Sequence, residues 1–224
     1  MHAIKVIFFD ATGTLIHLPR GVGFHYTEVA ARFGWNADAD SVGRAFRALW
    51  SEMPPPETTR EPKPDDDRSW WRGLVSRVLD RCGAPDGFDR DQYFRAVYDE
   101  FTQPGVWALY PEATEILDAL AGRYRLCVLS NFDRRLRTVL AQLGVLERFA
   151  QVVISSEAGA DKPDPWIFEH ACARARVMPH EALLVGDDPE CDVAGAQNAG
   201  WHAFHIERPR MTLRDLLPAL SDGD

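Results

Sequence analysis

The sequence predicts an α/β protein with a doubly wound parallel-sheet, Rossmann-like core and an inserted α-helical cap domain. Three observations support this fold class. Short apolar segments of strand length recur along the chain, and amphipathic helical patterns separate them in its second half. A long region after the first strand has helical patterns but no convincing strand. Regular alternation of strands and helices is typical of a parallel sheet that helices cover on both faces.

The predicted strands are apolar runs that fit buried parallel strands. The first covers residues 5–9 and ends directly before Asp10. The others cover residues 125–129, 152–154, 182–185 and, with a less regular pattern, 202–206. Each run is short enough to be a strand and is followed by turn or helix residues, so we expect all five in one sheet.

Helical patterns fill the spaces between these strands. Residues 111–121 and 133–143 each place apolar side chains at helical spacing, with Asp133 as the expected cap of the second helix. Two further helices are expected to start where an aspartate precedes a proline, at Asp164 and Asp188. Glycines at the helix ends are consistent with these limits.

The region after the first strand is predicted to be a separate helical domain. Helices are expected at residues 24–33, 40–53, 68–81 and 89–101. Residues 54–67, which are rich in proline and charged residues, are expected to form a loop. We therefore divide the chain into a core, residues 1–16 and 108–224, and a cap, residues 17–107. The hinges are expected at the two boundaries of the cap.

Composition restricts the function classes. A chain of 224 residues with 46% hydrophobic residues suits one globular core with an inserted domain. The net charge of -9 argues against a general nucleic-acid binder. The four cysteines show neither a C-x-x-C pair nor a zinc-ligand spacing, which favours a reducing, cytoplasmic location. We find no long apolar segment and expect no membrane partner.

Four short motifs carry the candidate chemistry. Residues 8–15 (FFDATGTL) offer a carboxylate, 128–131 (VLSN) a hydroxyl, 161–165 (DKPDP) a lysine, and 185–192 (VGDDPECD) an acidic cluster. Three of them follow predicted strands, and ligands of open α/β sheets bind beyond the carboxyl ends of the strands. A phosphoryl-transfer site needs such a set of nucleophile, oxyanion donor, fixed cation and metal ligands.

With these motifs in this order, the chain resembles the haloacid dehalogenase-like hydrolase superfamily, and most of all the subgroup with a helical cap after the first strand. The resemblance covers the whole chain. It implies a hydrolase that acts on a small-molecule substrate, here a phosphorylated metabolite, and uses Mg²⁺. The sequence leaves the oligomeric state open between monomer and homodimer.

The resemblance also implies catalytic roles. Asp10 would be the nucleophile, which forms an aspartyl-phosphate. The Ser130 hydroxyl and the Asn131 backbone amide would donate hydrogen bonds to the non-bridging oxygens. Lys162 would place a positive charge between two anions, the nucleophile and the phosphate. Gly13 would let backbone amides approach the phosphate closely.

The metal site is expected among the acidic residues and the turn after Asp10. The expected Mg²⁺ ligands are Asp10, Asp187 and the backbone carbonyl of Thr12. Asp192 is expected to support them or to hydrogen-bond Lys162. Asp188 either supports the site or only caps the following helix.

Thr12 departs from the phosphatase pattern. Phosphatases of the superfamily usually carry a second aspartate at this position, which acts as general acid and base, and threonine cannot do so near neutral pH. Three alternatives stay open: a Mg²⁺-dependent phosphatase without this acid, a 2-haloacid dehalogenase, and a weak or inactive phosphometabolite-binding protein. Gly186-Asp187-Asp188 favours a metal site and so the phosphatase, because the dehalogenases typically lack this motif.

Several residues after the first motif are candidates either for substrate contact or for packing in the cap. They are His17, Arg20, His25 and Tyr26. Tryptophans at positions 70, 71 and 107 are expected to pack within the cap or at its hinge.

Overall fold

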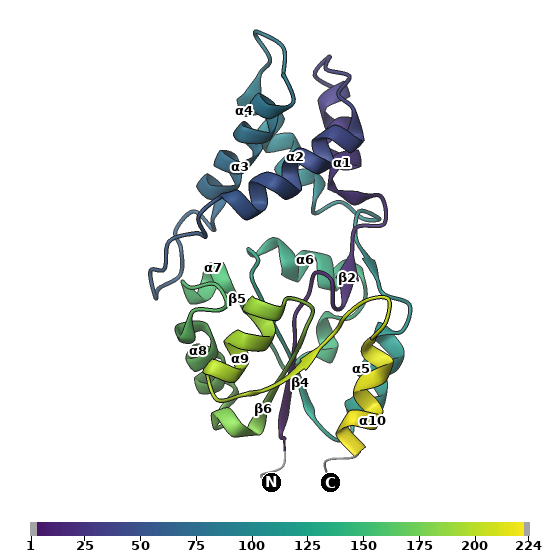
Figure 1. Ribbon diagram of the computed structural model, residues 1–224, viewed down its shortest axis with the longest axis vertical. Helices are drawn as coiled ribbons and strands as arrows, with labels where there is room; N and C mark the ends of the chain where they lie inside the picture. Colours follow the sequence, from purple (N-terminus) through teal and green to yellow (C-terminus); the bar gives the residue numbers. More distant parts are fainter. Residues whose placement is uncertain (1–3, 222–224) are drawn as a thin grey trace. The chain divides into compact units, whose positions relative to one another are not determined.

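The computed structural model describes residues 4–221, which form two compact units (Figure 1). The sheet unit contains the chain up to His17, residues Glu57–Asp66 and the chain from Leu109 onward. The helical unit contains Leu18–Pro56 and Asp67–Ala108. Each unit has a hydrophobic core of its own.

The sheet unit is built on five parallel strands in the order β5-β4-β1-β6-β7. The strands are β1 (Val6–Phe9), β4 (Arg125–Ser130), β5 (Gln151–Ile154), β6 (Ala182–Gly186) and β7 (His202–His205). After β1, the chain adds β4 and then β5 on one side of β1, and afterwards β6 and β7 on the other side. The predicted α/β class with a Rossmann-like sheet is therefore confirmed.

Helices cover both faces of this sheet, with α8 and α9 on one side and α5 and α10 on the other (Figure 1). The helices are α5 (Ala113–Leu120), α6 (Arg135–Gln142), α7 (Ser155–Ala158), α8 (Pro165–Ala175), α9 (Gly195–Asn198) and α10 (Leu216–Ser221). A π-helical turn, η3 (Pro189–Ala194), precedes α9, and 3₁₀ turns lie at η1 (Leu146–Arg148), η2 (Pro179–Glu181) and η4 (Leu213–Asp215).

Strand β1 lies at the centre of the sheet and is buried on both faces. Phe8 packs in one core cluster with Leu129 of β4, Leu184 of β6 and Phe168 of α8. Side chains alternate along a strand, so Ile7 and Phe9 point to the opposite face, where they are also fully buried. This double burial explains the continuous apolar run that predicts the strand.

The aspartate–proline pairs start helical turns as predicted. The Asp164 carboxylate accepts a hydrogen bond from the Trp166 N–H, and the Asp188 carboxylate accepts from the N–H groups of Glu190 and Cys191. The predicted Asp133 cap needs a small correction: the helix begins at Arg135, and Arg134 is the N-cap residue. Asp133 still accepts a hydrogen bond from the Arg135 N–H at 3.1 Å.

The helical unit consists of α1 (Gly21–Ala31), α2 (Ala39–Glu52), α3 (Arg68–Arg81) and α4 (Arg90–Glu100). Its core is rich in aromatic side chains, and Tyr26, Tyr93 and Phe94 are almost fully buried. Trp70 packs against this core and donates a hydrogen bond to the Pro54 carbonyl. Within residues 4–221, no helix combines the length and the apolar character that crossing a membrane requires.

Two features of the predicted cap region differ in the structure. Ile16–His17 form the short strand β2, which pairs with β3 (Ala108–Leu109), although no strand was expected there. Strands of two residues are too short to produce a periodic pattern. The second difference is that residues Glu57–Asp66, which lie inside the predicted cap, group with the sheet unit.

Backbone hydrogen bonds explain the placement of Glu57–Asp66. The N–H groups of Thr59 and Arg60 both donate to the Gly159 carbonyl, at 2.8 and 3.0 Å. The Lys63 N–H donates to the Ser156 carbonyl at 2.8 Å. The Asp66 carboxylate accepts from the Ser156 hydroxyl at 2.6 Å. These bonds attach the segment to α7 and the residue that follows it.

Candidate active site

The carboxyl ends of β1, β4 and β6 bring the predicted site residues to one edge of the sheet. Asp10 directly follows β1, Ser130 is the last residue of β4, and Asp187 directly follows β6. The chain reverses direction across the sheet between β1 and β6, which makes this edge the switch point where open α/β sheets bind ligands. The fold therefore places all three residues at the expected binding crevice.

Lys162 lies at the centre of a buried charge cluster. Its Nζ donates to Asp10 Oδ1 at 2.7 Å, to Asp192 Oδ1 at 2.6 Å and to the Leu129 carbonyl at 3.0 Å. The lysine side chain is only 2% exposed, so these three acceptors take the place of its hydration shell. The loop from α7 to α8 thus supplies a cation next to the carboxylate at the end of β1.

Asn131 fixes the backbone of this loop. Its side-chain amide donates to the Lys162 carbonyl at 2.9 Å, and its side-chain oxygen accepts from the Lys162 N–H at 2.7 Å. The paired bonds restrain the position of Lys162 relative to the end of β4. The sequence suggested a backbone role for Asn131 in substrate binding and gave no sign of this side-chain role.

The turn after Asp10 packs against Asp187. Gly13 has a φ of +89°, and a Cβ on this residue would collide with the Asp187 carboxylate. The Thr14 hydroxyl donates to Asp187 Oδ1 at 3.1 Å. Glycine is required at position 13 both for its backbone conformation and for this close approach.

Three carboxylates of the site lie close enough to share a cation. Asp10, Asp187 and Asp192 each offer an oxygen atom, and these oxygens lie within 4.8 Å of one another. An all-oxygen set of carboxylates suits a hard cation such as Mg²⁺, which binds a few carboxylates together with water and substrate oxygens. The donor chemistry of these residues therefore fits the metal that the sequence predicts.

The electrostatics of the cluster reflect one cation among three carboxylates. Burial raises the pKa of Asp10 to about 7, against the lowering influence of Lys162, and repulsion from Asp192 and Asp187 adds to the rise. Burial and then Asp192 also raise the pKa of Asp187. Burial by itself would lower the pKa of Lys162, but Asp10 and Asp192 outweigh it, so the pKa lies well above its usual range. Lys162 therefore stays charged, and a further cation beside the three carboxylates would relieve their mutual repulsion.

Asp188 and Asp192 differ in position. Asp192 is buried, and its second oxygen accepts from the Asp188 N–H at 3.0 Å, so it links Lys162 to the start of η3. Asp188 is exposed, and its carboxylate caps η3. It does not belong to the three carboxylates that lie close together.

Other predicted residues lie apart from these contacts. Thr12 is exposed in the turn after β1, and Ser130 is buried at the end of β4. Tyr26 is part of the core of the helical unit, and His25 is buried there with its Nδ1 atom 3.3 Å from Glu100. For these two residues the structure supports packing in the helical unit.

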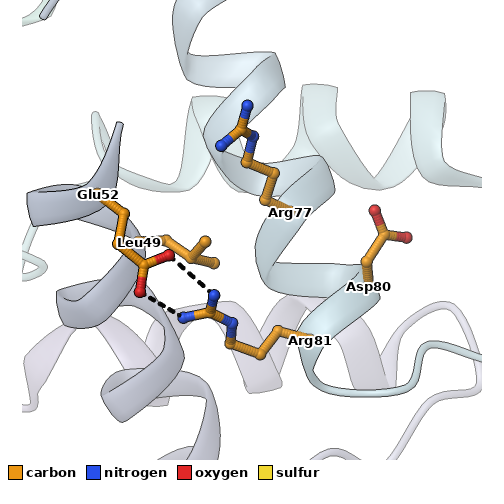
Figure 2. Close-up of a pocket in the computed structure, with 5 residues that line it drawn as sticks. All are labelled: Leu49, Glu52, Arg77, Asp80 and Arg81. Carbon is orange, nitrogen blue, oxygen red and sulfur yellow. Dashed lines mark hydrogen bonds and ion pairs between the residues drawn. The ribbon is translucent and has the colours of Figure 1, made fainter. Parts of the chain in front are cut away.

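A surface depression of the helical unit contains none of the candidate catalytic residues. Leu49 and Glu52 of α2 line it together with Arg77, Asp80 and Arg81 of α3 (Figure 2). The Glu52 carboxylate and the Arg81 guanidinium form two hydrogen bonds across it, at 3.2 and 2.9 Å. The Asp10, Asp187 and Asp192 carboxylates of the sheet edge take no part in it.

The fold defines an α/β protein with a parallel sheet and a buried carboxylate, Asp10, at the end of its first strand. The chain belongs to the haloacid dehalogenase-like hydrolase family, whose sequence profile matches residues 4–200. It is 33% identical over 223 residues to haloacid dehalogenase-like hydrolase domain-containing protein 3 of Mus musculus, covering 96% of this chain and 88% of that protein.

Two further similarities involve phosphatases. The chain is 40% identical over 174 residues to a phosphoserine phosphatase of Thermus thermophilus, covering 76% of this chain and 67% of that protein. The crystal structure of a HAD phosphatase from Thermococcus onnurineus superposes with a TM-score of 0.69 at 23% identity, covering 97% and 98% of the two chains. The second similarity concerns the fold alone.

Proposed function

We propose that this protein is a Mg²⁺-dependent phosphatase that acts on a small phosphorylated metabolite through an aspartyl-phosphate at Asp10. The observation that carries the proposal is the Lys162 ammonium, which lies within 2.7 Å of both Asp10 and Asp192 while Asp187 lies beside them. Proteins of this family commonly use Mg²⁺. The similarity to a phosphoserine phosphatase supports a phosphate ester as substrate.

In this mechanism, Asp10 attacks phosphorus with the oxygen that Lys162 does not hold. Lys162 binds Oδ1 of Asp10, which leaves Oδ2 for the attack. The new bond joins Oδ2 to phosphorus, and the bond from phosphorus to the alkoxide leaving group breaks. Lys162 reduces the repulsion between the carboxylate and the phosphate, and bound Mg²⁺ would supply further compensating charge for the phosphoryl oxygens.

Thr12 leaves the departing alkoxide without a carboxylic acid to protonate it. The proton must come from water, so substrates with good leaving groups are expected to react fastest. A second water then attacks the aspartyl-phosphate, which releases phosphate and restores Asp10. General acid–base catalysis contributes about 10²–10⁴-fold in enzymes, so slow turnover of ordinary alkyl phosphates is expected.

The experiment is a hydrolysis screen with two leaving groups. Purified protein is assayed with p-nitrophenyl phosphate and with a panel of phosphorylated metabolites that starts with phosphoserine, in Mg²⁺ and after chelation. We expect p-nitrophenyl phosphate to be hydrolysed faster, and all activity to be lost on chelation and restored by added Mg²⁺. Hydrolysis that is insensitive to chelation would contradict the proposal.

Thr12 also favours a second candidate, a 2-haloacid dehalogenase, because halide leaves without protonation. The same preparation is therefore incubated with 2-chloropropionate, and chloride release is measured with and without chelator. Chelator-insensitive chloride release would establish this alternative. Binding of phosphate analogues without turnover of any substrate would instead indicate a phosphometabolite-binding protein.

A further inference from the structure

Arg208, in the loop after β7, makes contacts with all three of its guanidinium nitrogens. Nε donates to the Gly13 carbonyl at 3.1 Å, and Nη2 donates to the Thr14 carbonyl at 3.0 Å. Nη1 lies 2.7 Å from the carboxylate of Glu112, which is itself almost fully buried. The guanidinium carbon Cζ lies 3.4 Å from the ring centre of Tyr110.

These contacts act on the turn that follows the candidate nucleophile. The carbonyls of three successive residues, Gly13, Thr14 and Leu15, accept hydrogen bonds from outside the turn. Arg208 holds the first two, and the Tyr110 N–H donates to the Leu15 carbonyl at 3.0 Å. The His17 ring also stacks on Tyr110, with the two ring centres 4.6 Å apart. The turn is therefore held along its length.

The same turn packs against Asp187, one of the carboxylates proposed to bind Mg²⁺. Gly13 packs directly against the Asp187 carboxylate, and the Thr14 hydroxyl donates to it. A shift of the two carbonyls that Arg208 holds would move both contacts. An unbroken chain of contacts thus joins Arg208 to Asp187, although the arginine does not touch the carboxylate cluster.

Charge indicates that Arg208 has a geometric role. Glu112 compensates its positive charge, so the guanidinium adds little net attraction for a phosphate or for the acidic cluster. What remains is a planar fork that reaches two carbonyls and a carboxylate at once. Lysine cannot reproduce this arrangement, because an ammonium is a point charge on a flexible stem.

We propose that Arg208 is a positioning residue that fixes the turn after Asp10 and thereby sets the Mg²⁺ affinity of the Asp10 and Asp187 carboxylates. The proposal rests on the proposed function for the identity of the metal. No motif in the sequence points to Arg208, which lies between Glu207 and Pro209 in a stretch without periodicity.

The test measures Mg²⁺ binding directly. Mg²⁺ is titrated calorimetrically into the wild type, Arg208→Lys and Arg208→Ala, and p-nitrophenyl phosphate hydrolysis is measured in parallel. Loss of an outer partner of metal ligands typically costs about 10–100-fold in affinity or activity. We expect a loss of that size in Mg²⁺ affinity and in kcat, with KM little changed. Millimolar guanidinium should restore part of the loss in Arg208→Ala and none in the wild type.

The control is Arg210→Lys. Arg210 lies two residues along the same loop, its side chain is 82% exposed, and its ion pair is with Glu207. We expect it to match the wild type in both measurements. Folding of each variant is checked by circular dichroism and by Tm, and if neither Arg208 variant folds, Glu112→Gln tests the same arrangement with a smaller expected loss of affinity.

Wild-type Mg²⁺ affinity in folded Arg208→Lys, or a lower Tm without a change in affinity, would overturn the proposal. Failure of the proposed function has a different appearance: the wild type binds Mg²⁺ but hydrolyses no phosphate ester, and the calorimetric comparison still decides the role of Arg208. A wild type that binds no Mg²⁺ overturns both.

Discussion

The sheet unit and the helical unit both contain arginine– or lysine–carboxylate pairs, but in opposite environments. Lys162 and its two aspartates are buried at the sheet edge, with side chains at most 11% exposed. Figure 2 shows the Glu52–Arg81 pair of the helical unit. About half of each of these two side chains is exposed to solvent. An exposed pair stays hydrated whether or not it forms, whereas a buried cluster loses its hydration and depends on its internal partners. If the proposed function holds, the buried cluster is the arrangement that holds charged groups ready for chemistry.

The largest expected effect tests whether the buried cluster is catalytic. Asp10→Asn removes the attacking carboxylate oxygen, so we expect kcat for p-nitrophenyl phosphate to fall by about 10⁴-fold or more. Asp164→Asn is the matched control, because Asp164 caps α8 outside the cluster and its loss should leave kcat unchanged. Substantial residual activity in folded Asp10→Asn would remove Asp10 as the nucleophile.

The second prediction compares the two environments through stability. Lys162→Met leaves buried carboxylates without their cation, and breaking a buried pair in this way costs about 3–5 kcal/mol. For a chain of this size, each kcal/mol lowers Tm by about 2–4 °C. Arg81→Met in the helical unit should leave Tm nearly unchanged. Both are followed by thermal melts without metal, and equal shifts in the two variants would show that burial does not distinguish the pairs.

A smaller effect is expected at Thr12. If the absent carboxylic acid limits turnover, Thr12→Asp should raise kcat for alkyl phosphates by about 10–100-fold, a part of the usual acid–base contribution. The exposed position of Thr12 in the turn leaves room for the longer side chain. Thr12→Asn controls for shape without acidity and should give no gain. A folded Thr12→Asp protein with unchanged kcat would show that another step limits the rate.

The smallest effect concerns stability and pH. Because burial raises the pKa of Asp10 to about 7, the folded state binds its proton more tightly than the unfolded chain, where the pKa is 3.8. This contribution is fully present below pH 3.8 and is lost as pH rises through about 7. Asn has no such titration, so metal-free Asp10→Asn should be more stable than the wild type at neutral pH, by about 0.5–2 kcal/mol.

Urea unfolding at pH 5 and pH 8 measures this difference. The advantage of Asp10→Asn should be larger at pH 8 than at pH 5, and Mg²⁺ should remove it by stabilising the wild type. An advantage that is independent of pH would show that Asp10 is already ionised in the folded protein at the lower pH.

Much of the fold was predictable because its local signals agree with its tertiary structure. Strands β1, β4, β5 and β6 appear in the sequence as apolar runs because nearly all their side chains are buried, whereas β7, which is partly exposed, gives a less regular pattern. The starts of α8 and η3 follow from aspartate–proline pairs whose hydrogen bonds are local. The two-residue strands β2 and β3 could not be predicted, because so few residues leave no period.

The candidate site was predictable where a residue lies in a motif and hidden where it acts from outside one. Asp192 was expected either to support the metal ligands or to hydrogen-bond Lys162, and the Lys162 Nζ donates to Asp192 Oδ1 at 2.6 Å. The side-chain clamp by Asn131 and the support from Arg208 depend on contacts between distant segments, which leave no trace in spacing or composition. For the same reason, the attachment of Glu57–Asp66 to the sheet unit was not foreseen.

The division of the helical unit into two inserted segments has a consequence for how the chain folds. Residues Leu18–Pro56 and Asp67–Ala108 each leave the sheet unit and return to it, yet they share one hydrophobic core, with Tyr26 of the first packed among Leu74 and Tyr93 of the second. The first segment carries the helical pair α1 and α2 and the second the pair α3 and α4, and each pair buries apolar side chains against the other. If the two pairs dock early, the segment between β1 and β4 is a compact body and no longer a long flexible loop. The flexible loop that must close before β1 pairs with β4 is then shorter. The entropic barrier to pairing the central strands is then lower than their separation in the sequence implies.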